Sequence, residues 1–320
     1  MLEHVHIQNY RSFVDASAKL SPFTLVIGAN ASGKTNFLRL FRDLNRGTSG
    51  GGYALDNGGH PSNGRHLMPH QSRPGHPTEI DLEFDDFPPV RCRGSDIIGD
   101  ALPWPVGSLE IFAIEPDKVS APEEIFENPF VEGDGTGTAR VYDMLKTGVR
   151  DELADQIQKT VIQFIPEITR IGVRLVAKGI KEIEARERGM DGPTEGRYLS
   201  AGTRILLALI TIVHQPAPPP LLLIEDIDHA IHPRLFEDFV NFLRRMCGER
   251  GIQIIATTHN PYLLDCFQED FDSVLLVEKV NGASTITSVG DQVTNLRHHG
   301  APLSMSLSDL YLSGALKKVL

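Results

Sequence analysis

The chain has 320 residues, 41% of them apolar and 23% charged, so it is long enough to bury a substantial core and does not read as a disordered protein. A formal net charge of −11 argues against a surface that binds nucleic acid non-specifically, but it is compatible with a local basic groove. The three cysteines form no CxxC pair, and the sequence has neither an apolar signal segment nor a run near the roughly 20 residues that span a bilayer. We therefore expect a cytoplasmic protein outside the membrane, without a disulfide framework or a zinc site.

The first predicted elements are short strands within residues 2 to 28, the last of them the apolar run FTLVIG. The motif GANASGKT follows, from Gly28 to Thr35, and opens the apolar-periodic segment NFLRLF, which predicts a helix. This G-x-x-x-x-G-K-[ST] spacing lets backbone N–H groups and a helix N-terminus hold a diphosphate, while Gly28 and Gly33 leave room for the backbone to approach it. We expect Lys34 to reach the terminal phosphates and Thr35 to offer its hydroxyl to Mg²⁺. The alternative is a chance glycine-rich turn, which the strand before and the helix after disfavour.

The predicted helix fades near Arg46, and residues 47 to 77 are rich in Gly, Ser, Pro, Asn and His, which predicts a mobile surface loop. Histidines in this loop suggest a metal site, but no cysteine or carboxylate cluster accompanies them, so solvated side chains are the preferred interpretation. These histidines are His60, His66, His70 and His76. The runs TEIDLEF and SLEIFAIE then predict strands of an antiparallel element beside the phosphate loop.

Residues 121 to 199 are predicted to form a lobe of helices and strands. Apolar residues recur at helical spacing in DELADQIQKTVIQFI until Pro166 ends the run, RIGVRLVAK alternates as a strand does, and KEIEARER reads as a charged, solvated face. The lobe leads to YLSAGTR, where Ser200 is placed to cap the buried helix RILLALITIV. Such a cap leaves N–H groups facing outward toward an anion, although an ordinary helix start needs no ligand.

Two buried strands of the C-terminal half end in polar side chains. The strand in LLLIED ends at Glu225 and Asp226, and IIATTHN ends near His259. Because ligands of α/β sheets bind at the carboxyl ends of strands, we expect Glu225 to hold the magnesium shell and Asp226 to orient or deprotonate the attacking water. His259 is placed to contact the γ-phosphate or the water. The alternative interpretations need no ligand: the acid pair caps the next helix, and His259 has a structural role. Alternating strands and helices predict an α/β fold with a largely parallel sheet.

Together these motifs resemble the ABC-type ATPase heads of the RecF, SMC and OLD (overcoming lysogenization defect) group. The segments NYRSF, GANASGKTNFL, YLSAGTR, LLLIEDIDHAIHP and IIATTHNPYLL stand in the order in which such heads carry their R-loop, Walker A, signature, Walker B with D-loop, and switch histidine. The resemblance implies one P-loop NTPase domain of ABC-ATPase type over residues 1 to 320, with a largely parallel sheet flanked by helices, an antiparallel β element and a small helical lobe.

By this resemblance the protein binds ATP and Mg²⁺, and two copies close around two ATP molecules as a homodimer. Arg11 would lie near the phosphates, Asp228 would cross the dimer interface, and Ser200 and Gly202 would complete the partner's site in trans. The implied nucleotide-binding residues are Arg11, Gly28, Asn30, Ala31, Ser32, Gly33, Lys34, Thr35, Asn36, Ser200 and Gly202. The implied catalytic residues are Lys34, Glu225, Asp226 and His259, with Thr35 and Glu225 as the metal ligands.

The sequence departs from the group's pattern at several positions. Asp226 stands where the group has Glu, which predicts slow hydrolysis, Ile227 replaces a proline, and the signature reads LSAGT rather than LSGGQ. Gln71 is a weak candidate for the Q-loop glutamine. The chain lacks the long coiled coils of SMC proteins, and too few residues follow His259 for the nuclease domain of OLD proteins. We therefore expect a stand-alone, OLD-like ATPase.

The resulting hypothesis is an ATP-hydrolysing switch that controls a separately encoded nuclease or other effector in DNA maintenance or anti-phage defence. An alternative is an ATP-binding scaffold with negligible hydrolysis, and a less favoured one is the nucleotide-binding subunit of a membrane importer. Direct DNA binding, the effector and any assembly beyond a dimer stay open. The C-terminal segment, residues 303 to 320, is expected to pack on the core rather than to offer an apolar helix to a partner.

Overall fold

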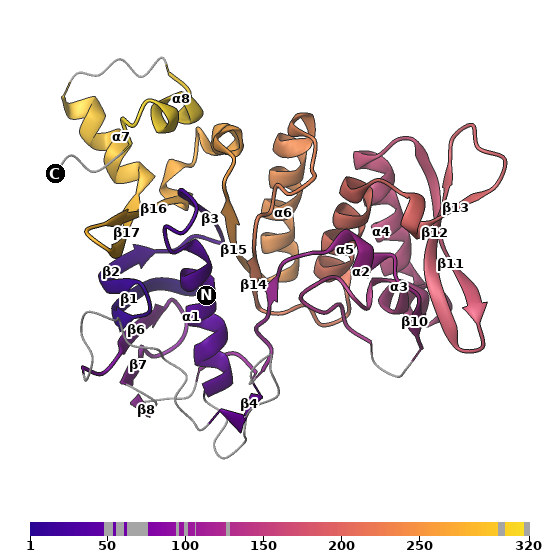
Figure 1. Ribbon diagram of the computed structural model, residues 1–320, viewed down its shortest axis with the longest axis horizontal. Coiled ribbons are helices and arrows are strands. Elements are labelled where there is room, and N and C mark those ends of the chain that lie inside the picture. Colours follow the sequence, from indigo (N-terminus) through magenta and orange to yellow (C-terminus); the bar gives the residue numbers. More distant parts are fainter. Residues whose placement is uncertain are drawn as a thin grey trace. The chain divides into compact units, whose positions relative to one another are not determined.

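The computed structural model describes residues 1–47, 54–55, 61–62, 76–93, 96–98, 102–105, 107–125, 129–299 and 305–316 (Figure 1). The chain divides into two compact units. The first unit comprises Met1–Ile111, Pro219–Ile227 and Cys247–Leu320, and the second comprises Phe112–Pro218 and Asp228–Met246. Most of the predicted loop at residues 47 to 77, with Gln71 and three of its four histidines, lies outside the described residues.

The first unit is built on a sheet whose order, within the described residues, is β8-β7-β6-β1-β2-β17-β16-β3-β15-β14-β9. Its strands are β1 (Leu2–Tyr10), β2 (Phe13–Lys19), β3 (Phe23–Ile27), β6 (Glu79–Phe84), β7 (Val90–Arg93), β8 (Asp96–Ile98), β9 (Ile111–Phe112), β14 (Leu221–Ile224), β15 (Gln253–Thr258), β16 (Val274–Val280) and β17 (Ala283–Ser288). Strands β14, β15, β3 and β16 pair in parallel, whereas β2, β1, β6, β7 and β8 pair antiparallel. The predicted α/β fold, with a parallel sheet and an antiparallel element, is confirmed.

The parallel strands are short apolar runs because both faces of this part of the sheet are covered. Every residue of β3, β14 and β15 is buried. Helix α1 (Lys34–Gly47) turns its apolar stripe to the core, where Phe37 meets Phe41 and Phe13 edge to face. This packing fixes the helix whose first residue is Lys34.

Strands β4 (Ala54–Leu55) and β5 (Pro61–Ser62) of the first unit form a separate two-stranded sheet, and further elements of this unit follow β15 along the chain. The 3₁₀ segment η3 (Pro261–Phe267) precedes β16, and α7 (Val289–His298) and α8 (Leu307–Leu312) follow β17 (Figure 1). Helix α8 packs on η3, where both carboxylate oxygens of Asp265 accept hydrogen bonds from Ser308. Leu307 and Leu310 are buried, as expected for a C-terminal segment that joins the core. Helix α6 (Phe236–Arg250) carries the chain from the second unit back to the first.

The second unit contains the whole of the predicted lobe at residues 121 to 199 and also the buried helix that follows it. Its helices are α2 (Pro116–Val119), α3 (Thr138–Thr147), α4 (Asp151–Phe164) and α5 (Ala201–His214), and its strands are β10 (Glu123–Glu124), β11 (Ile168–Ala177), β12 (Ile180–Glu187) and β13 (Pro193–Glu195). The sheet order is β10-β12-β11, with β13 also paired to β12. Helix α4 ends before Pro166, as predicted.

Two sequence expectations are wrong. The segment KEIEARER, which we expected to be a solvated face, forms the central strand β12, because Ile183 and Ala185 alternate toward the core and Glu182 is buried against Arg174. The run SLEIFAIE was expected to form a strand of the antiparallel element, but it contributes only the two residues of β9, at the opposite edge of the sheet beside β14. No helix in the described part of the chain is long and apolar enough to cross a bilayer.

Candidate functional site

The loop between β3 and α1 needs its glycines because other parts of the first unit press against it. A Cβ on Gly28 would lie 2.1 Å from the carbonyl oxygen of Val277, and a Cβ on Gly33, whose φ is +120°, would lie 2.3 Å from Ser284 Oγ. Ala31 adopts a left-handed φ of 59°. The loop is therefore held in one tight shape between its strand and helix.

Two serines show how this loop is held. Ser284 donates its hydroxyl proton to the carbonyl of Ser32, which ties the loop to β17. The hydroxyl of Ser32 is buried and has no hydrogen-bond partner in the part of the chain that the structure describes. A buried polar atom of this kind costs free energy unless a further group satisfies it.

Lys34 lies at the start of α1 and is buried. Its Nζ donates to the carbonyls of Gly28, at 2.8 Å, and Ala29, at 3.1 Å, and lies 3.1 Å from Nδ1 of His259. Burial lowers the pKa of Lys34, while the nearby carboxylates of Asp226 and Glu225 act to raise it. The lysine thus lies within the electrostatic reach of the acid pair.

The acid pair follows β14 directly. Thr35 donates its hydroxyl proton to Oε1 of Glu225, so the two side chains expected to bind the metal are in contact. Oδ1 of Asp226 lies 3.5 Å from Nε2 of His259. Because the ammonium group of Lys34 has only donors, Nδ1 of His259 must accept, which leaves the ring proton on Nε2, facing Asp226.

These groups meet because three adjacent parallel strands end at the same edge of the sheet. Ile224 at the end of β14 is in register with Ala256 of β15, and Thr258 at the end of β15 is in register with Ile27 of β3. The carboxyl ends of the strands therefore deliver the acid pair, the histidine and the loop to one place.

Sequence reasoning missed one residue of this site, Thr257. Its hydroxyl accepts the N–H of Asp226 at 3.0 Å, and its carbonyl accepts the N–H of Ile227 at 3.0 Å. Asp226 has a φ of 48°, in the left-handed region. Thr257 thus holds the acidic residue in a conformation that few residues adopt. The pattern TTH placed a threonine there, but nothing in the sequence indicated its partner.

Arg11 binds within the first unit to a residue that the sequence did not suggest. Its guanidinium donates to Oδ2 of Asp43 at 2.8 Å and to the hydroxyl of Tyr10 at 2.8 Å, and Tyr10 donates to the same carboxylate at 2.9 Å. Burial, followed by the charge of Asp43, raises the pKa of Tyr10. Asp43 lies nine residues beyond Lys34 on α1, roughly 14 Å along the helix axis. That Arg11 contacts phosphate stays a prediction.

The other expected ligands of the loop region are distributed around it. Asn30 and Ala31 are exposed, and Asn36 donates its side-chain N–H to Ser12 Oγ at 3.0 Å. Among the described residues no group of three or more His, Cys, Asp or Glu side chains could hold a metal ion. A Mg²⁺ ion that binds phosphates needs only one or two protein oxygens, and the adjacent oxygens of Thr35 and Glu225 fit that requirement.

The signature segment lies in the second unit. Ser200 caps α5, as predicted, by accepting the N–H of Thr203 at 3.0 Å. A Cβ on Gly202 would lie 2.4 Å from the carbonyl oxygen of Ala230, so only glycine fits there. Asp228, two residues before Ala230, accepts the N–H of Ile231 at its carbonyl. The start of α5 and the segment after the acid pair are therefore packed backbone to backbone.

The comparisons with known proteins agree with this geometry. A family model described as "AAA domain, putative AbiEii toxin, Type IV TA system" matches residues 105–265, and one described as "AAA ATPase domain" matches residues 1–84. No curated protein matches the chain in sequence.

Two solved structures share the fold. The Smc head bound to the C-winged helix domain of ScpA is 15% identical, with a TM-score of 0.59 over 92% of this chain and 99% of that one. The Smc head domain with an extended coiled coil, bound to the C-terminal domain of ScpA derived from Pyrococcus furiosus, is 14% identical, with a TM-score of 0.53 over 93% of this chain and 99% of that one. At these identities the likeness shows the fold alone.

Proposed function

The chain belongs to the AAA-domain family whose model covers residues 105–265, and from this premise we propose that it is an ABC-type ATPase that works as an ATP-driven molecular switch. The observation that carries the proposal is the convergence of Lys34, Thr35, Glu225, Asp226 and His259 at the carboxyl ends of three parallel strands. A phosphate loop, a pair of metal-binding oxygens and a carboxylate for water are the parts that phosphoryl transfer to water requires.

Each side chain has one role in this proposal. The N–H groups of the loop and the Nζ of Lys34 bind the phosphates, and Thr35 and Glu225 hold Mg²⁺, which when bound neutralises phosphate charge. Asp226 orients the attacking water or takes its proton. His259 lies between Lys34 and Asp226, so a change in the charge on either side of the ring alters its hydrogen bonding. This position suits a sensor of the γ-phosphate.

The proposed switch is a homodimer closed around two ATP molecules. Ser200 satisfies one N–H at the start of α5, and the helix N-terminus keeps its positive dipole end for an anion. The contact of Gly202 with Ala230 ties this helix start to the segment of Asp228, which follows the acid pair. The acid pair expected at the ATP site and the segment of Asp228 expected at the dimer interface would then belong to one continuous stretch of chain.

We further propose that the protein is an OLD-like ATPase of the cytoplasm that controls a separately encoded nuclease or effector in DNA maintenance or anti-phage defence. The family description names a toxin of a toxin–antitoxin system, and the similar Smc heads are bound to ScpA, which supports a protein partner. If the purified protein alone cut DNA with Mg²⁺, this division of labour would be refuted.

Phosphate release by three proteins tests the ATPase proposal. Wild type should release phosphate from ATP, Lys34→Ala should lose nucleotide binding, and Asp226→Asn should bind ATP with little turnover. Circular dichroism and thermal melting of each variant control for folding. Equal background rates in all three would favour the alternative of a non-catalytic scaffold, which the short side chain of Asp226 motivates.

Closure is tested separately, by the mass in solution of Asp226→Asn with and without ATP. We expect the mass to double on addition of ATP and Mg²⁺, and Ser200→Arg, which places a bulky cation at the helix start, to block the doubling. A mass that ATP leaves unchanged would refute the dimeric switch.

A further inference from the structure

Strand β11 is an edge strand of unusual length. It has ten residues, and within the described residues it pairs only with β12, which takes β10 and β13 on its other side. An edge strand presents a row of backbone N–H and C=O groups that another chain can pair with, and proteins commonly cover or shorten such edges. Here only part of the edge is covered.

The contacts of Ile171 show which backbone groups point away from β12. Its N–H donates to Oε1 of Gln158 at 3.1 Å, and its carbonyl accepts the hydroxyl of Tyr142 at 3.4 Å. Because backbone groups alternate along a strand, the N–H and C=O of Val173 and Leu175 also point outward. Neither residue has a partner for these groups in the described part of the chain, so this half of the edge is open.

The open half also carries exposed apolar side chains. Leu175 is 66% exposed and Val176 is 47% exposed. Ile125, which follows β10 on the other side of β12, is 47% exposed, and its N–H donates to the carbonyl of Gly179 at the hairpin turn at 3.0 Å. Open backbone groups next to exposed aliphatic side chains are the two features that strand addition uses.

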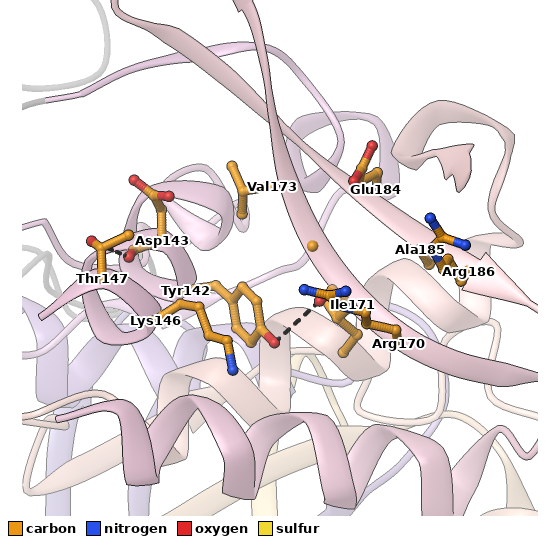
Figure 2. Close-up of a pocket in the computed structure, with 11 residues that line it drawn as sticks. Tyr142, Asp143, Lys146, Thr147, Arg170, Ile171, Val173, Glu184, Ala185 and Arg186 are labelled. Carbon is orange, nitrogen blue, oxygen red and sulfur yellow. Dashed lines mark hydrogen bonds between the residues drawn. The ribbon is translucent and has the colours of Figure 1, made fainter. Parts of the chain in front are cut away.

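A cavity of about 290 Å³ adjoins the same strand, lined by the C-terminal end of α3 and by parts of β11 and β12 (Figure 2). Arg170 and Arg186 line it and are directly opposite each other in the strand register. Like charges in this position repel, and within the described residues neither arginine has an ion-pair partner. Asp143 and Lys146, which also line the cavity, already pair with other side chains.

One further charged side chain lines the cavity, the carboxylate of Glu184. Within the part of the chain that the structure describes, the lining charges without an ion-pair partner are therefore two guanidinium groups and one carboxylate, which is a net positive charge. A ligand with carboxylates would relieve the repulsion between the two arginines. The cation excess and the open edge thus select the same kind of ligand, an extended chain with acidic side chains.

We propose that β11 is the docking site for an extended acidic segment of a partner protein, which pairs with Val173 and Leu175 and sets carboxylates near Arg170 and Arg186. A second copy of β11 fits less well. Antiparallel pairing of Val173 with Leu175 of a second copy sets the two Arg174 side chains opposite each other. The proposal names the surface for the effector partner proposed above. Binding there needs no nucleotide, so its failure is distinguishable from failure of the ATPase.

The test uses the full chain and a fluorescent ten-residue peptide of alternating valine and glutamate, with an alternating valine and lysine peptide as the counterpart. Fluorescence anisotropy should show saturable binding of the acidic peptide, weakened by salt, and at least tenfold weaker binding of the basic one. No saturable binding of the acidic peptide, or equal binding of both, overturns the proposal.

Three variants locate the site. Val173→Pro removes only an outward N–H, which an edge strand tolerates, and should weaken binding of the acidic peptide at least tenfold. Arg170→Glu should weaken it as much, whereas Lys178→Glu, with the same charge change at the exposed hairpin turn, should stay within twofold. If Val173→Pro unfolds, the comparison of Arg170→Glu with Lys178→Glu decides. The proposal is overturned if Arg170→Glu and Lys178→Glu weaken peptide binding equally. It is also overturned if the protein forms a dimer without nucleotide and Val173→Pro abolishes that dimer, because a second copy would then occupy the strand.

Discussion

Replacement of Thr257 by valine tests whether the backbone of Asp226 must be held for hydrolysis. The valine side chain nearly conserves volume but removes the hydroxyl that accepts the Asp226 N–H at 3.0 Å, while the carbonyl bond to Ile227 remains. A partly buried N–H without a partner costs about 1–3 kcal/mol. If that cost falls on the transition state alone, kcat drops roughly 5- to 150-fold, since each 1.36 kcal/mol is a factor of ten.

Steady-state phosphate release gives kcat and KM, and calorimetry gives the affinity for ATP. We expect Thr257→Val to lower kcat within that range and to leave the affinity for ATP within about threefold, because in the described part of the chain the hydroxyl makes no hydrogen bond to Lys34 or to the loop. Thr257→Ser keeps the acceptor and should restore most of the rate. An unchanged kcat in the valine variant would refute the reasoning. So would an equal loss in the serine variant, or a melting temperature so low that unfolding explains the rate.

Two further predictions concern packing and thiol chemistry. Gly28→Ala places a methyl group 2.1 Å from a backbone carbonyl oxygen, so it should destabilise the fold by about 1–3 kcal/mol and weaken ATP binding. Gly248 lies in a helix with open space around it, so Gly248→Ala should be neutral or stabilising in the same thermal melt. Burial raises the pKa of the Cys92 thiol to about 11 and that of the Cys247 thiol to about 12. Iodoacetamide at pH 8 should therefore label only the partly exposed Cys266 of the native protein, and all three cysteines after denaturation. Mass spectrometry that shows fast labelling of Cys92 or Cys247 in the native protein would contradict this prediction.

The features of the candidate site whose local structure the sequence predicted are specified by neighbouring residues, and the roles of these residues stay predictions. The loop from Gly28 to Thr35 is a contiguous motif, and the rule that ligands gather at strand ends brought the acid pair to it without knowledge of the strand order. The prediction that Ser200 caps its helix depended on one residue and the apolar run behind it. A short stretch of chain contains the information for each motif, whereas the contact of Thr35 with Glu225 joins two motifs that are far apart in the sequence.

The contacts that escaped prediction join distant segments through individual side chains. Arg11 and Asp43 are 32 residues apart. Arg11 follows a strand and Asp43 lies in the third turn of a helix, and neither hydrophobic periodicity nor a sequence motif predicts that the two side chains meet. Thr257 and Asp226 are 31 residues apart and meet only because their strands are neighbours. KEIEARER looked solvated because its charges dominate the composition, whereas the alternation of Ile183 and Ala185 decided its place in the sheet.

Backbone strain identifies the same loops by an observation that uses no motif. In the described part of the chain six residues other than glycine have positive φ, and they are Asn9, Arg11, Ala31, Asp226, Ala230 and Asn281. Asn281 is explained by the Asn-Gly turn that it forms with Gly282 between β16 and β17. The other five lie in the segments NYRSF, GANASGKT and LLLIEDIDHA. Alanine and arginine have no local preference for this conformation, which costs on the order of 1–3 kcal/mol and persists only where surrounding structure imposes it. Tertiary contacts, such as that of Ala230 with Gly202, therefore set the backbone of these loops, as the proposed site for phosphates and a metal ion would require.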